Sequence, residues 1–350
     1  MRILITGGAG FIGSNIACHL RSVRPAAEIV CMDNLYRKGS ELNVARYPPL
    51  GIQFHRGDVR HPADFPAGPF DLLIECSAEP SVLAGSAGSP AYLFETNLVG
   101  AFQCLEQARS WQAKVIFLST SRVYPVRRLE SHPWQEEATR FAWLDEGVSG
   151  ITARGVAEEL RLEGRRSLYG FTKLACEQMI EEYRDTYGLS AVVNRCGVIA
   201  GPWQFGKVDQ GIVAHWVMAH VFDRPLSYIG YGGQGKQVRD VLHVQDLCEL
   251  VGEQITAFDV WDGWTGNVAG GLANSVSLLE LTALCQEITG REIAINSDPQ
   301  TRPNDLRLFI GDCSRLFERT SWRPSRSVRQ VVADTLAWVT GQQQELRQLA

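Results

Sequence analysis

Residues 6–13 read Thr-Gly-Gly-Ala-Gly-Phe-Ile-Gly and directly follow the apolar run 3–5. Glycine serves where the backbone turns tightly, where a phosphate approaches the main chain, and where a helix packs closely on a strand, and the spacing of Gly7, Gly10 and Gly13 suits these three tasks. N–H groups at a helix start bind phosphate. The stretch therefore predicts a strand, a tight turn and a helix that hold a pyrophosphate.

An acidic residue follows at the distance that a dinucleotide site requires. Asp33 ends the next apolar run, 20 residues after Gly13, where a carboxylate can accept hydrogen bonds from an adenosine ribose. A carboxylate repels a 2′-phosphate, so the pattern favours NAD over NADP. Arg37 and Lys38 follow closely and could bind such a phosphate, which leaves NADP open.

Apolar runs alternate with amphipathic segments through the first half of the chain. The runs are 3–5, 29–32, 72–74, 115–118 and 191–194, and helix-like stretches lie at 11–24, 92–110 and 174–187. Continuous apolar strands indicate a parallel sheet that is buried on both faces. We therefore expect an α/β fold, a Rossmann-type doubly wound parallel sheet.

After residue 196 the sequence becomes rich in Gly and Trp, in segments that we expect to form loops. We expect a mainly dinucleotide-binding domain at 1–196 and a smaller, discontinuous substrate lobe at 197–350, with some segments returning to the first domain. Residues 125–166 form a long, charged insert in the first domain, and connections of that length usually serve as lids or specificity loops.

Composition excludes several classes of protein. The chain has 350 residues, 45% of them hydrophobic, and a formal net charge of −5, which excludes global disorder and gives no basic footprint for a nucleic acid. The nine cysteines form no CxxC pair or Cys/His cluster, so we expect reduced thiols and no metal. No apolar stretch approaches the length of a membrane span, and we expect a cytoplasmic protein with no membrane partner.

A reactive constellation is predicted at the carboxyl edge of the sheet. Tyr169 and Lys173 share one helical face, so the ammonium can lower the phenol pKa and make the phenol a usable proton acceptor. The hydroxyl run 119–121 follows the strand at 115–118 and supplies a third partner. On its own, a Tyr-xxx-Lys pair is also compatible with an ordinary surface pair.

Together these residues resemble the extended short-chain dehydrogenases/reductases that act on nucleotide-diphosphate sugars. The resemblance covers nearly the whole chain and rests on 6–13, 33–35, 57–59, 96–100, 119–124, Tyr169 with Lys173, 237–244 and 302–305. It implies catalytic roles for Thr120, Tyr169 and Lys173, a diphosphate clamp of Arg239 and Arg302, and a homodimer joined through the helices at 92–110 and 174–187.

The predicted sites are as follows. The cofactor site comprises Gly7, Gly10, Phe11, Ile12, Gly13, Asp33, Asn34, Arg37, Lys38, Asp58, Val59, Ser77, Ala78, Glu79, Asn97, Ser119, Tyr169, Lys173 and Cys196. The substrate site comprises Glu79, Thr120, Ser121, Arg122, Gln204, Gln210, Arg239 and Arg302, with Asp209 as a further candidate for lining the sugar pocket.

The type of reaction is indicated by the two residues after Thr120. The 4,6-dehydratases of this family have Asp-Glu there, the acid and base that eliminate water, whereas this chain has Ser121-Arg122. The departure implies an epimerase that oxidises a sugar carbon with tightly held NAD and returns the hydride.

A closer likeness is to the CDP-paratose 2-epimerases, through 33–39, 120–124, 204–211 and the long insert before Tyr169. It implies epimerisation of a CDP-hexose at C2. The alternatives are a UDP-sugar 4-epimerase, a net nucleotide-sugar reductase and a non-enzymatic dinucleotide sensor. Pro125 and 75–78 depart from the family pattern, which usually has glycine after Val-Tyr and His-x-Ala-Gly in the strand-end loop.

Overall fold

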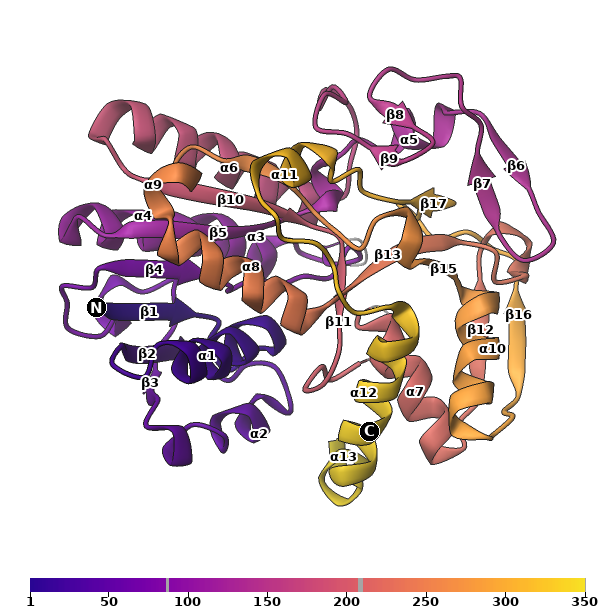
Figure 1. Ribbon diagram of the computed structural model, residues 1–350, viewed down its shortest axis with the longest axis horizontal. Coiled ribbons are helices and arrows are strands. Elements are labelled where there is room, and N and C mark those ends of the chain that lie inside the picture. The colour runs from indigo at the N-terminus through magenta and orange to yellow at the C-terminus, as the bar shows by residue number, and fades with distance from the viewer. Residues whose placement is uncertain (86–87, 207–209, 350) are drawn as a thin grey trace. The chain divides into compact units, whose positions relative to one another are not determined.

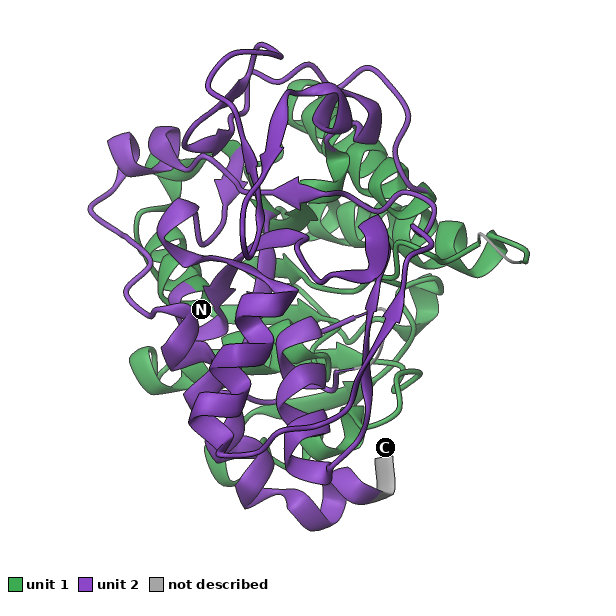
Figure 2. Ribbon diagram, turned by 90° about the vertical axis from the view of Figure 1, so that its right-hand side faces the viewer, with its two compact units in different colours: residues 1–123, 168–195, 247–265 green, residues 124–167, 196–246, 266–350 purple. Residues whose placement is uncertain are grey.

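The computed structural model describes residues 1–85, 88–206 and 210–349. The chain divides into two compact units, coloured separately in Figure 2. Unit 1 contains residues 1–123, 168–195 and 247–265, and unit 2 contains residues 124–167, 196–246 and 266–350.

Unit 1 is built on a parallel sheet. The strands of this sheet are β1 (Arg2–Thr6), β2 (Glu28–Asp33), β3 (Gln53–Arg56), β4 (Leu72–Glu75), β5 (Lys114–Thr120), β10 (Ala191–Cys196) and β14 (Thr265–Val268), in the order β14-β10-β5-β4-β1-β2-β3. Cys196 of β10 and residues 266–268 of β14 are counted in unit 2. The pairs β1–β2, β1–β4, β2–β3 and β4–β5 are parallel, with Ile3 opposite both Ile29 and Leu72. The predicted fold class is confirmed: this is a doubly wound α/β sheet.

Helices cover both faces of this sheet (Figure 1). They are α1 (Phe11–Val23), α2 (Ser40–Val44), α3 (Ala91–Phe94), α4 (Gly100–Trp111), α6 (Leu168–Tyr187), α8 (Val244–Thr256) and α9 (Phe258–Trp261). Buried side chains of α4 and α6, including Leu105 and Ile180, form one core with strand residues such as Leu73 and Val115. In Figure 1, α1 and α8 lie over the face nearer the viewer.

Short helical turns complete unit 1. They are η1 (Pro48–Leu50), η2 (Pro62–Asp64), η3 (Glu95–Val99) and η4 (Ser121–Val123). Two of them bear on the predicted site, because η3 carries Asn97 and η4 carries Ser121 and Arg122 directly after β5. The carboxyl ends of β1, β2, β4 and β5 thus all lead into loops or turns that contain predicted site residues.

Unit 2 mixes small sheets with helices. Its strands are β6 (Trp134–Glu136), β7 (Phe141–Trp143), β8 (Ile151–Thr152), β9 (Gly155–Val156), β11 (Val198–Ala200), β12 (Leu226–Ile229), β13 (Val238–His243), β15 (Ser275–Ser277), β16 (Ile295–Asp298) and β17 (Leu308–Phe309). Strand β13 is central, since it pairs with β11, β15 and β17.

The helices of unit 2 pack around a second core. They are α5 (Val126–Ser131), η5 (Tyr231–Gly233), α7 (Ile212–Phe222), η6 (Leu272–Asn274), α10 (Leu278–Thr289), α11 (Ser314–Arg319), α12 (Val328–Gly341) and α13 (Gln343–Leu349). Val213, Val217, Leu281, Val331 and Val339 are fully or almost fully buried in this core.

The insert at 124–167 belongs to unit 2, although we assigned it to the first domain. Specific contacts explain this: the Phe141 amide donates to the Lys236 carbonyl, Ser277 Oγ donates to the Thr139 carbonyl, and the Arg307 amide donates to Glu130. With these residues unit 2 is about as long as unit 1, whereas we expected a smaller second lobe. That residues 1–196 mainly bind the dinucleotide and residues 197–350 mainly bind the substrate stays a prediction.

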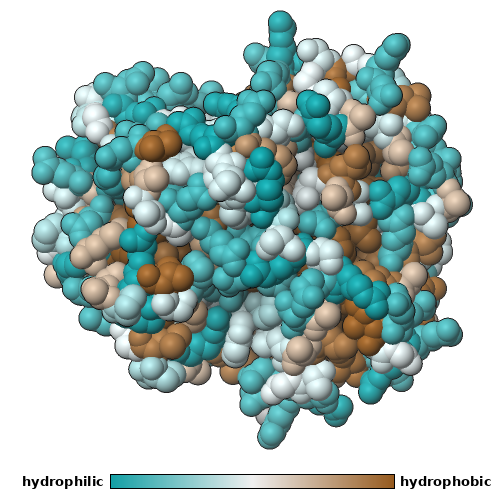
Figure 3. Space-filling model, in the orientation of Figure 1, coloured by the Kyte–Doolittle hydropathy of each residue, from teal (hydrophilic) through white to brown (hydrophobic). Residues whose placement is uncertain are grey.

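No helix among the described residues is long and apolar enough to cross a membrane. Hydrophilic side chains predominate on the face shown in Figure 3, with apolar patches between them. All nine cysteines are free, and all but Cys18 and Cys76 are buried. The described part of the chain holds no group of three or more His, Cys, Asp or Glu side chains that could bind a metal.

Candidate active site

Gly7, Gly8 and Gly13 stand where no side chain fits. Gly7 has a φ of +62°, and a Cβ there would lie 2.6 Å from the Cys76 carbonyl group at the end of β4. A Cβ on Gly13 would lie 2.5 Å from the Gly7 oxygen. The turn between β1 and α1 therefore packs backbone against backbone, which leaves its outer surface open to the close approach of a ligand.

Helix α1 begins immediately after this turn. Gly10 is its N-cap and its amide donates to the Gly7 carbonyl, so Phe11 and Ile12 form the start of the helix. The first turn has no acidic residue. The positive end of the helix dipole is thus uncompensated by a side chain of that turn, as suits a phosphate.

Asp33 is fixed beside the glycine turn by backbone donors. Its Oδ2 accepts a hydrogen bond from the Ala9 amide at 3.1 Å, and its Oδ1 accepts one from the Leu35 amide at 2.8 Å. Burial raises the pKa of Asp33, and these amides oppose that rise. Each carboxylate oxygen can accept a further bond, so the side chain can also receive a ribose hydroxyl.

Two hydrogen bonds to the same turn come from residues that no sequence pattern indicated. Asn43 Nδ2 donates to the Ala9 carbonyl at 2.9 Å, and the buried Tyr47 hydroxyl donates to the Gly8 carbonyl. Both lie in or just after α2, more than 30 residues from the turn. Only the folded arrangement of α2 identifies them.

Asp58 and Val59, which are predicted to lie beside an adenine, contact other residues of the protein. Asp58 accepts hydrogen bonds from Arg60 on both carboxylate oxygens, at 3.0 and 2.7 Å, and one from Asn34 Nδ2 at 2.9 Å. Arg60 lowers the pKa of Asp58 well below its usual range. Val59 is buried and would touch a Cβ on Gly100. A role for Asp58 and Val59 at an adenine stays a prediction.

The start of α6 is held against the turn that follows β5. A Cβ on Gly170 would lie 2.1 Å from the Arg122 carbonyl oxygen, so only glycine allows this approach. Thr120 is buried at the end of β5, and its hydroxyl accepts a hydrogen bond from the Arg122 amide at 3.2 Å. The neighbouring Tyr169 is thereby brought to the strand end that carries Thr120.

Lys173 makes a buried ion pair that the sequence did not predict. Its Nζ lies 3.3 Å from Oε2 of Glu75 at the end of β4, and the two side chains are 4% and 3% exposed. Burial lowers the pKa of Lys173, but Glu75 and Tyr169 raise it more, and the result is about 12. Ser77 Oγ donates to the other Glu75 oxygen at 2.5 Å.

Asn97 connects the β4 loop to α6. Its Oδ1 accepts from the Glu79 amide at 2.7 Å, and its Nδ2 donates to the Glu79 carbonyl at 3.1 Å and to Thr172 Oγ1 at 3.1 Å. These bonds hold the loop that contains Ser77, Ala78 and Glu79 beside the helix of Tyr169 and Lys173.

A second buried ion pair lies one turn further along α6. Arg195 donates to both oxygens of Glu177 at 2.8 to 3.1 Å, and Ser119 Oγ donates to Glu177 at 2.5 Å. The two charged side chains are 8% and 6% exposed. Ser119, predicted at the cofactor, is thus also tied to the scaffold.

Arg37 is half-buried and Lys38 is exposed in unit 1, and a role for either at the cofactor stays a prediction. The predicted residues from position 196 onward belong to unit 2. Arg239 pairs with Asp305 at 2.9 Å, inside the predicted 302–305 stretch, and Arg302 is half-buried in the same stretch. Gln204 Nε2 donates to the Ile199 carbonyl at 3.1 Å, and its buried Oε1 has no partner. Cys196 is buried, Gln210 is half-buried, and Asp209 lies outside the described residues.

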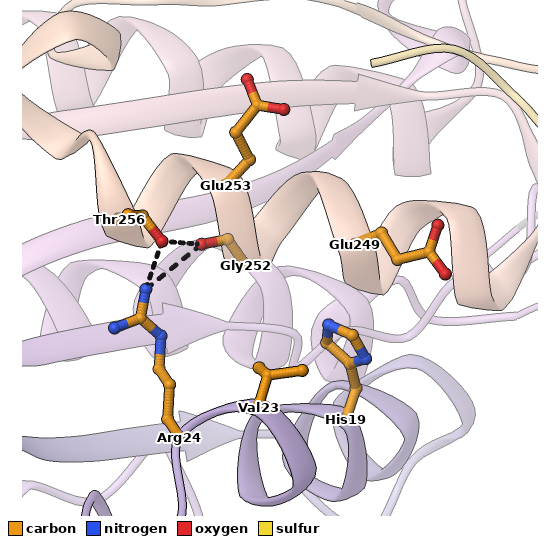
Figure 4. Close-up of a pocket in the computed structure, with 7 residues that line it drawn as sticks. All are labelled: His19, Val23, Arg24, Glu249, Gly252, Glu253 and Thr256. Atoms are coloured by element: carbon orange, nitrogen blue, oxygen red, sulfur yellow. Dashed lines mark hydrogen bonds between the residues drawn. The ribbon is translucent and has the colours of Figure 1, made fainter. Parts of the chain in front are cut away.

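A surface pocket of about 410 Å³ lies elsewhere in unit 1, between α1 and α8 (Figure 4). It is lined by His19, Val23, Arg24, Glu249, Gly252, Glu253 and Thr256. Arg24 crosses it to donate to Thr256 Oγ1 at 2.5 Å and to the Gly252 carbonyl at 3.3 Å. None of these residues belongs to the predicted sites.

The NAD-dependent epimerase/dehydratase family model matches residues 3–260, well over half of the chain. The chain belongs to this family. The match includes the glycine turn, Thr120, Tyr169, Lys173 and Arg239. The resemblance stated from these residues is thereby confirmed at the level of the family.

Relatives in this epimerase/dehydratase family are named for more than one reaction. The chain is 31% identical to the CDP-paratose 2-epimerase of Salmonella typhi, over 97% of this chain and 99% of the relative. It is 27% identical to a dTDP-glucose 4,6-dehydratase of Xanthomonas campestris, over 96% of this chain and 92% of that one.

Solved structures of the family share the fold. The UDP-glucose 4-epimerase of Thermus thermophilus, in complex with NAD, superposes with a TM-score of 0.77 at 25% identity, over 97% of this chain and 99% of that one. The UDP-glucuronic acid 4-epimerase of Bacillus cereus superposes with a TM-score of 0.78 at 22% identity, over 97% and 99%.

The residues of unit 1 fit the NAD of this family. The glycine turn offers bare backbone at the positions where any Cβ would clash, α1 offers its N-terminus, and the Asp33 carboxylate is anchored beside them. These are the three elements that bind a pyrophosphate and an adenosine ribose. An NAD-dependent enzyme is the class that the family and this geometry support.

Proposed function

We propose that the protein epimerises the sugar of a nucleotide-diphosphate sugar, by transient oxidation to a keto-sugar and reduction on the opposite face. The substrate that we propose is a CDP-hexose and the reacting carbon is C2. Support comes from the 31% identity to a CDP-paratose 2-epimerase over nearly the full length of both chains.

The observation that carries the choice of epimerisation is the turn after β5. Elimination of water needs an acid and a base beside the sugar, and the residues that follow Thr120 are Ser121 and Arg122, neither of which has a carboxylate. The approach of Gly170 to the Arg122 carbonyl keeps this turn next to Tyr169. Oxidation and reduction remain possible there, whereas dehydration lacks its groups.

Tyr169 accepts and returns the proton of the sugar hydroxyl. Its phenolate accepts the proton of the sugar hydroxyl as that carbon is oxidised, and the phenol returns it after the sugar has turned. Lys173, on the next turn of α6, stabilises the phenolate by its charge. Thr120 holds the reacting sugar oxygen by a hydrogen bond, and bound NAD supplies the acceptor and donor of the hydride.

The nucleotide diphosphate keeps the substrate bound while the sugar rotates. Arg239 and Arg302 bind the diphosphate, a role that suits the planar donors of arginine. Arg239 is held in place by Asp305 at 2.9 Å. Gln204 and Gln210 contact the sugar. Binding energy concentrated on the diphosphate leaves the sugar free to present either face.

The proposal is tested without added cofactor. Protein as purified is denatured and its released NAD measured, and the native protein is incubated in deuterated water with CDP-, UDP-, GDP- and dTDP-hexoses. The expected product is a C2 epimer of a CDP-hexose with unchanged mass and no deuterium on carbon, because the abstracted hydride returns. Tyr169→Phe, with the same ring and no hydroxyl, should retain NAD and lose turnover.

Other outcomes decide between the remaining functions. Inversion at C4 of a UDP-sugar would establish a 4-epimerase. Product formed only while NAD(P)H is supplied and consumed would establish a net reductase and overturn the proposal. Retained NAD with no product from any sugar nucleotide would favour a dinucleotide sensor.

We also propose that the enzyme is a homodimer joined through α4 and α6. These helices contact each other within unit 1, and apolar side chains on and beside them are 41–56% exposed: Val99, Phe102, Phe171 and Tyr187. A second copy that covers this face would bury them. Sedimentation should give twice the chain mass, and Phe102→Glu with Phe171→Glu should give monomers.

A further inference from the structure

Glu75 occupies a position at which a carboxylate is unexpected. It ends β4 in a stretch, 75–78, that departs from the family pattern, and its side chain is 3% exposed. Its partners are Lys173 Nζ at 3.3 Å and Ser77 Oγ at 2.5 Å. The lysine that is proposed to stabilise the Tyr169 phenolate is therefore already paired with an anion.

The other groups around Lys173 add little charge. Tyr169 and Cys176 on α6 and Cys104 on α4 interact electrostatically with Lys173, and its Nζ lies 4.3 Å from the centre of the Phe117 ring on β5. Glu177, one turn further along α6, is paired with Arg195 of β10. Burial raises the pKa of Cys104 far above its usual range and that of Cys176 to about 12, so both thiols are neutral. Glu177 and Arg195 neutralise each other.

We propose that Glu75 is a positioning residue: it holds the Lys173 ammonium at the sheet edge and, by neutralising its charge, opposes ionisation of the Tyr169 phenol. An ammonium has three N–H donors, so the bond to Glu75 leaves donors for another ligand. The inference rests on the proposed function only in assigning Tyr169 the role of proton acceptor.

The Glu75 carboxylate should make ionisation of the Tyr169 phenol less favourable. With Glu75 charged, the group formed by Glu75, Lys173 and Tyr169 changes from net charge 0 to −1 when the phenol ionises. Without that carboxylate it would change from +1 to 0, which costs less in a buried setting. In the proposed epimerisation the Tyr169 phenolate accepts the sugar proton during oxidation, and the phenol formed in that step returns the proton during reduction. A carboxylate that opposes ionisation of the phenol makes the phenolate the stronger proton acceptor.

The decisive experiment measures the Tyr169 phenol directly. Full-length protein labelled with [13Cζ]tyrosine is titrated by NMR, and the Tyr169 signal is the one missing from Tyr169→Phe. In Glu75→Gln the pKa of Tyr169 should fall by about one unit, as expected for removal of a unit charge several ångströms away at an effective dielectric near 20. Glu75→Asp keeps the charge and should titrate close to wild type.

A second variant covers the case in which Glu75→Gln does not fold. Glu75→His introduces the residue type of the family pattern, and its imidazole is neutral at the alkaline pH where tyrosine ionises. The same downward shift is expected. An unchanged Tyr169 titration in a folded Glu75→Gln or Glu75→His protein overturns the inference, as does an equal shift in Glu75→Asp, because positioning alone would then explain it.

The titration uses no sugar nucleotide, so it is independent of the proposed function. If the protein epimerises a sugar nucleotide, the acid limb of its kcat/KM profile should move down in pH by the same amount in Glu75→Gln. A shifted NMR titration with no turnover on any sugar nucleotide would retain the inference and reject the proposed function.

Discussion

Units 1 and 2 hold their charged side chains in different ways. In unit 1 two ion pairs that involve α6 are buried, with Lys173, Glu75, Arg195 and Glu177 all less than 10% exposed. In unit 2 two other pairs are partly exposed on both sides: Arg239 and Asp305 are 18% and 24% exposed, and Arg140 and Glu280 are 24% and 25% exposed.

The difference separates charges that hold the scaffold from charges that can exchange partners. Removing one member of a buried pair leaves an uncompensated charge away from water, which is costly. A partly exposed pair can be replaced by water or by a ligand at small cost. Arg239 can therefore leave Asp305 for a diphosphate, whereas Arg195 has no comparable freedom.

The largest expected effect is on stability in unit 1. Arg195→Ala leaves the buried Glu177 carboxylate unpaired and should lower the free energy of unfolding by about 3–5 kcal/mol. Denaturant titration measures it. Replacement of both partners, Arg195→Met with Glu177→Leu, should recover much of the loss, and a double variant as unstable as the single one would contradict the charge explanation.

Asp240 sharpens the comparison, because it is a fully buried carboxylate in unit 2. Its Oδ2 accepts from the Gly271 and Gly311 amides at 3.1 and 2.9 Å, and burial raises its pKa to about 6. Since the folded pKa exceeds the unfolded value of 3.8, the stabilisation is full below about pH 4 and is lost as the pH rises to about 6.

Asp240→Asn should therefore remove a pH dependence. Relative to the variant, wild type should lose roughly 3 kcal/mol of stability between about pH 4 and pH 6. Urea unfolding of both proteins across this range gives the difference, and parallel curves would show that Asp240 does not titrate in the folded chain.

A smaller effect is expected on substrate binding at Arg239. Arg239→Lys keeps the charge and loses the two-pronged donor, so KM for the nucleotide sugar should rise about tenfold with little change in kcat. Arg140→Lys, which alters a similarly half-buried arginine paired with Glu280, is the matched control and should leave KM unchanged. Equal effects of the two variants would remove the distinction that we draw for Arg239.

The smallest effect is expected for the partly exposed pair of Arg140 and Glu280. Arg140→Ala should lower the free energy of unfolding by about 1 kcal/mol or less, since water replaces much of what Glu280 loses. A loss as large as that of Arg195→Ala would break the contrast between the two units. Both are measured by the same denaturant titration.

Local pattern was sufficient to predict the fold class and the strand, glycine turn and helix at the start of the chain. The glycines of 6–13 and Asp33 act through their own backbone and their immediate neighbours, so their spacing carries the information. Tyr169 and Lys173 share a helix face for the same reason. The family followed from these short stretches taken together.

Contacts between distant segments could not be predicted in this way. Glu75 and Lys173 are separated by 98 positions and meet only because α6 packs beside the ends of β4 and β5. The affiliation of 124–167 with unit 2 depends on backbone bonds to β13 and its neighbours, which no periodicity within the insert reveals. The Arg60 partner of Asp58 was close in sequence but carried no pattern to distinguish it from a surface arginine.

The contact between Gly170 and the Arg122 carbonyl has a consequence for how such enzymes diversify. The contact uses the backbone of residue 122 and excludes any side chain at 170, so position 170 is closed to substitution, whereas the contact itself does not require particular side chains at 121 and 122. Docking of the tyrosine helix is thus encoded at a different position from the side chains that we propose exclude dehydration. A lineage can exchange Ser-Arg for Asp-Glu, or the reverse, without rebuilding the framework that carries the tyrosine.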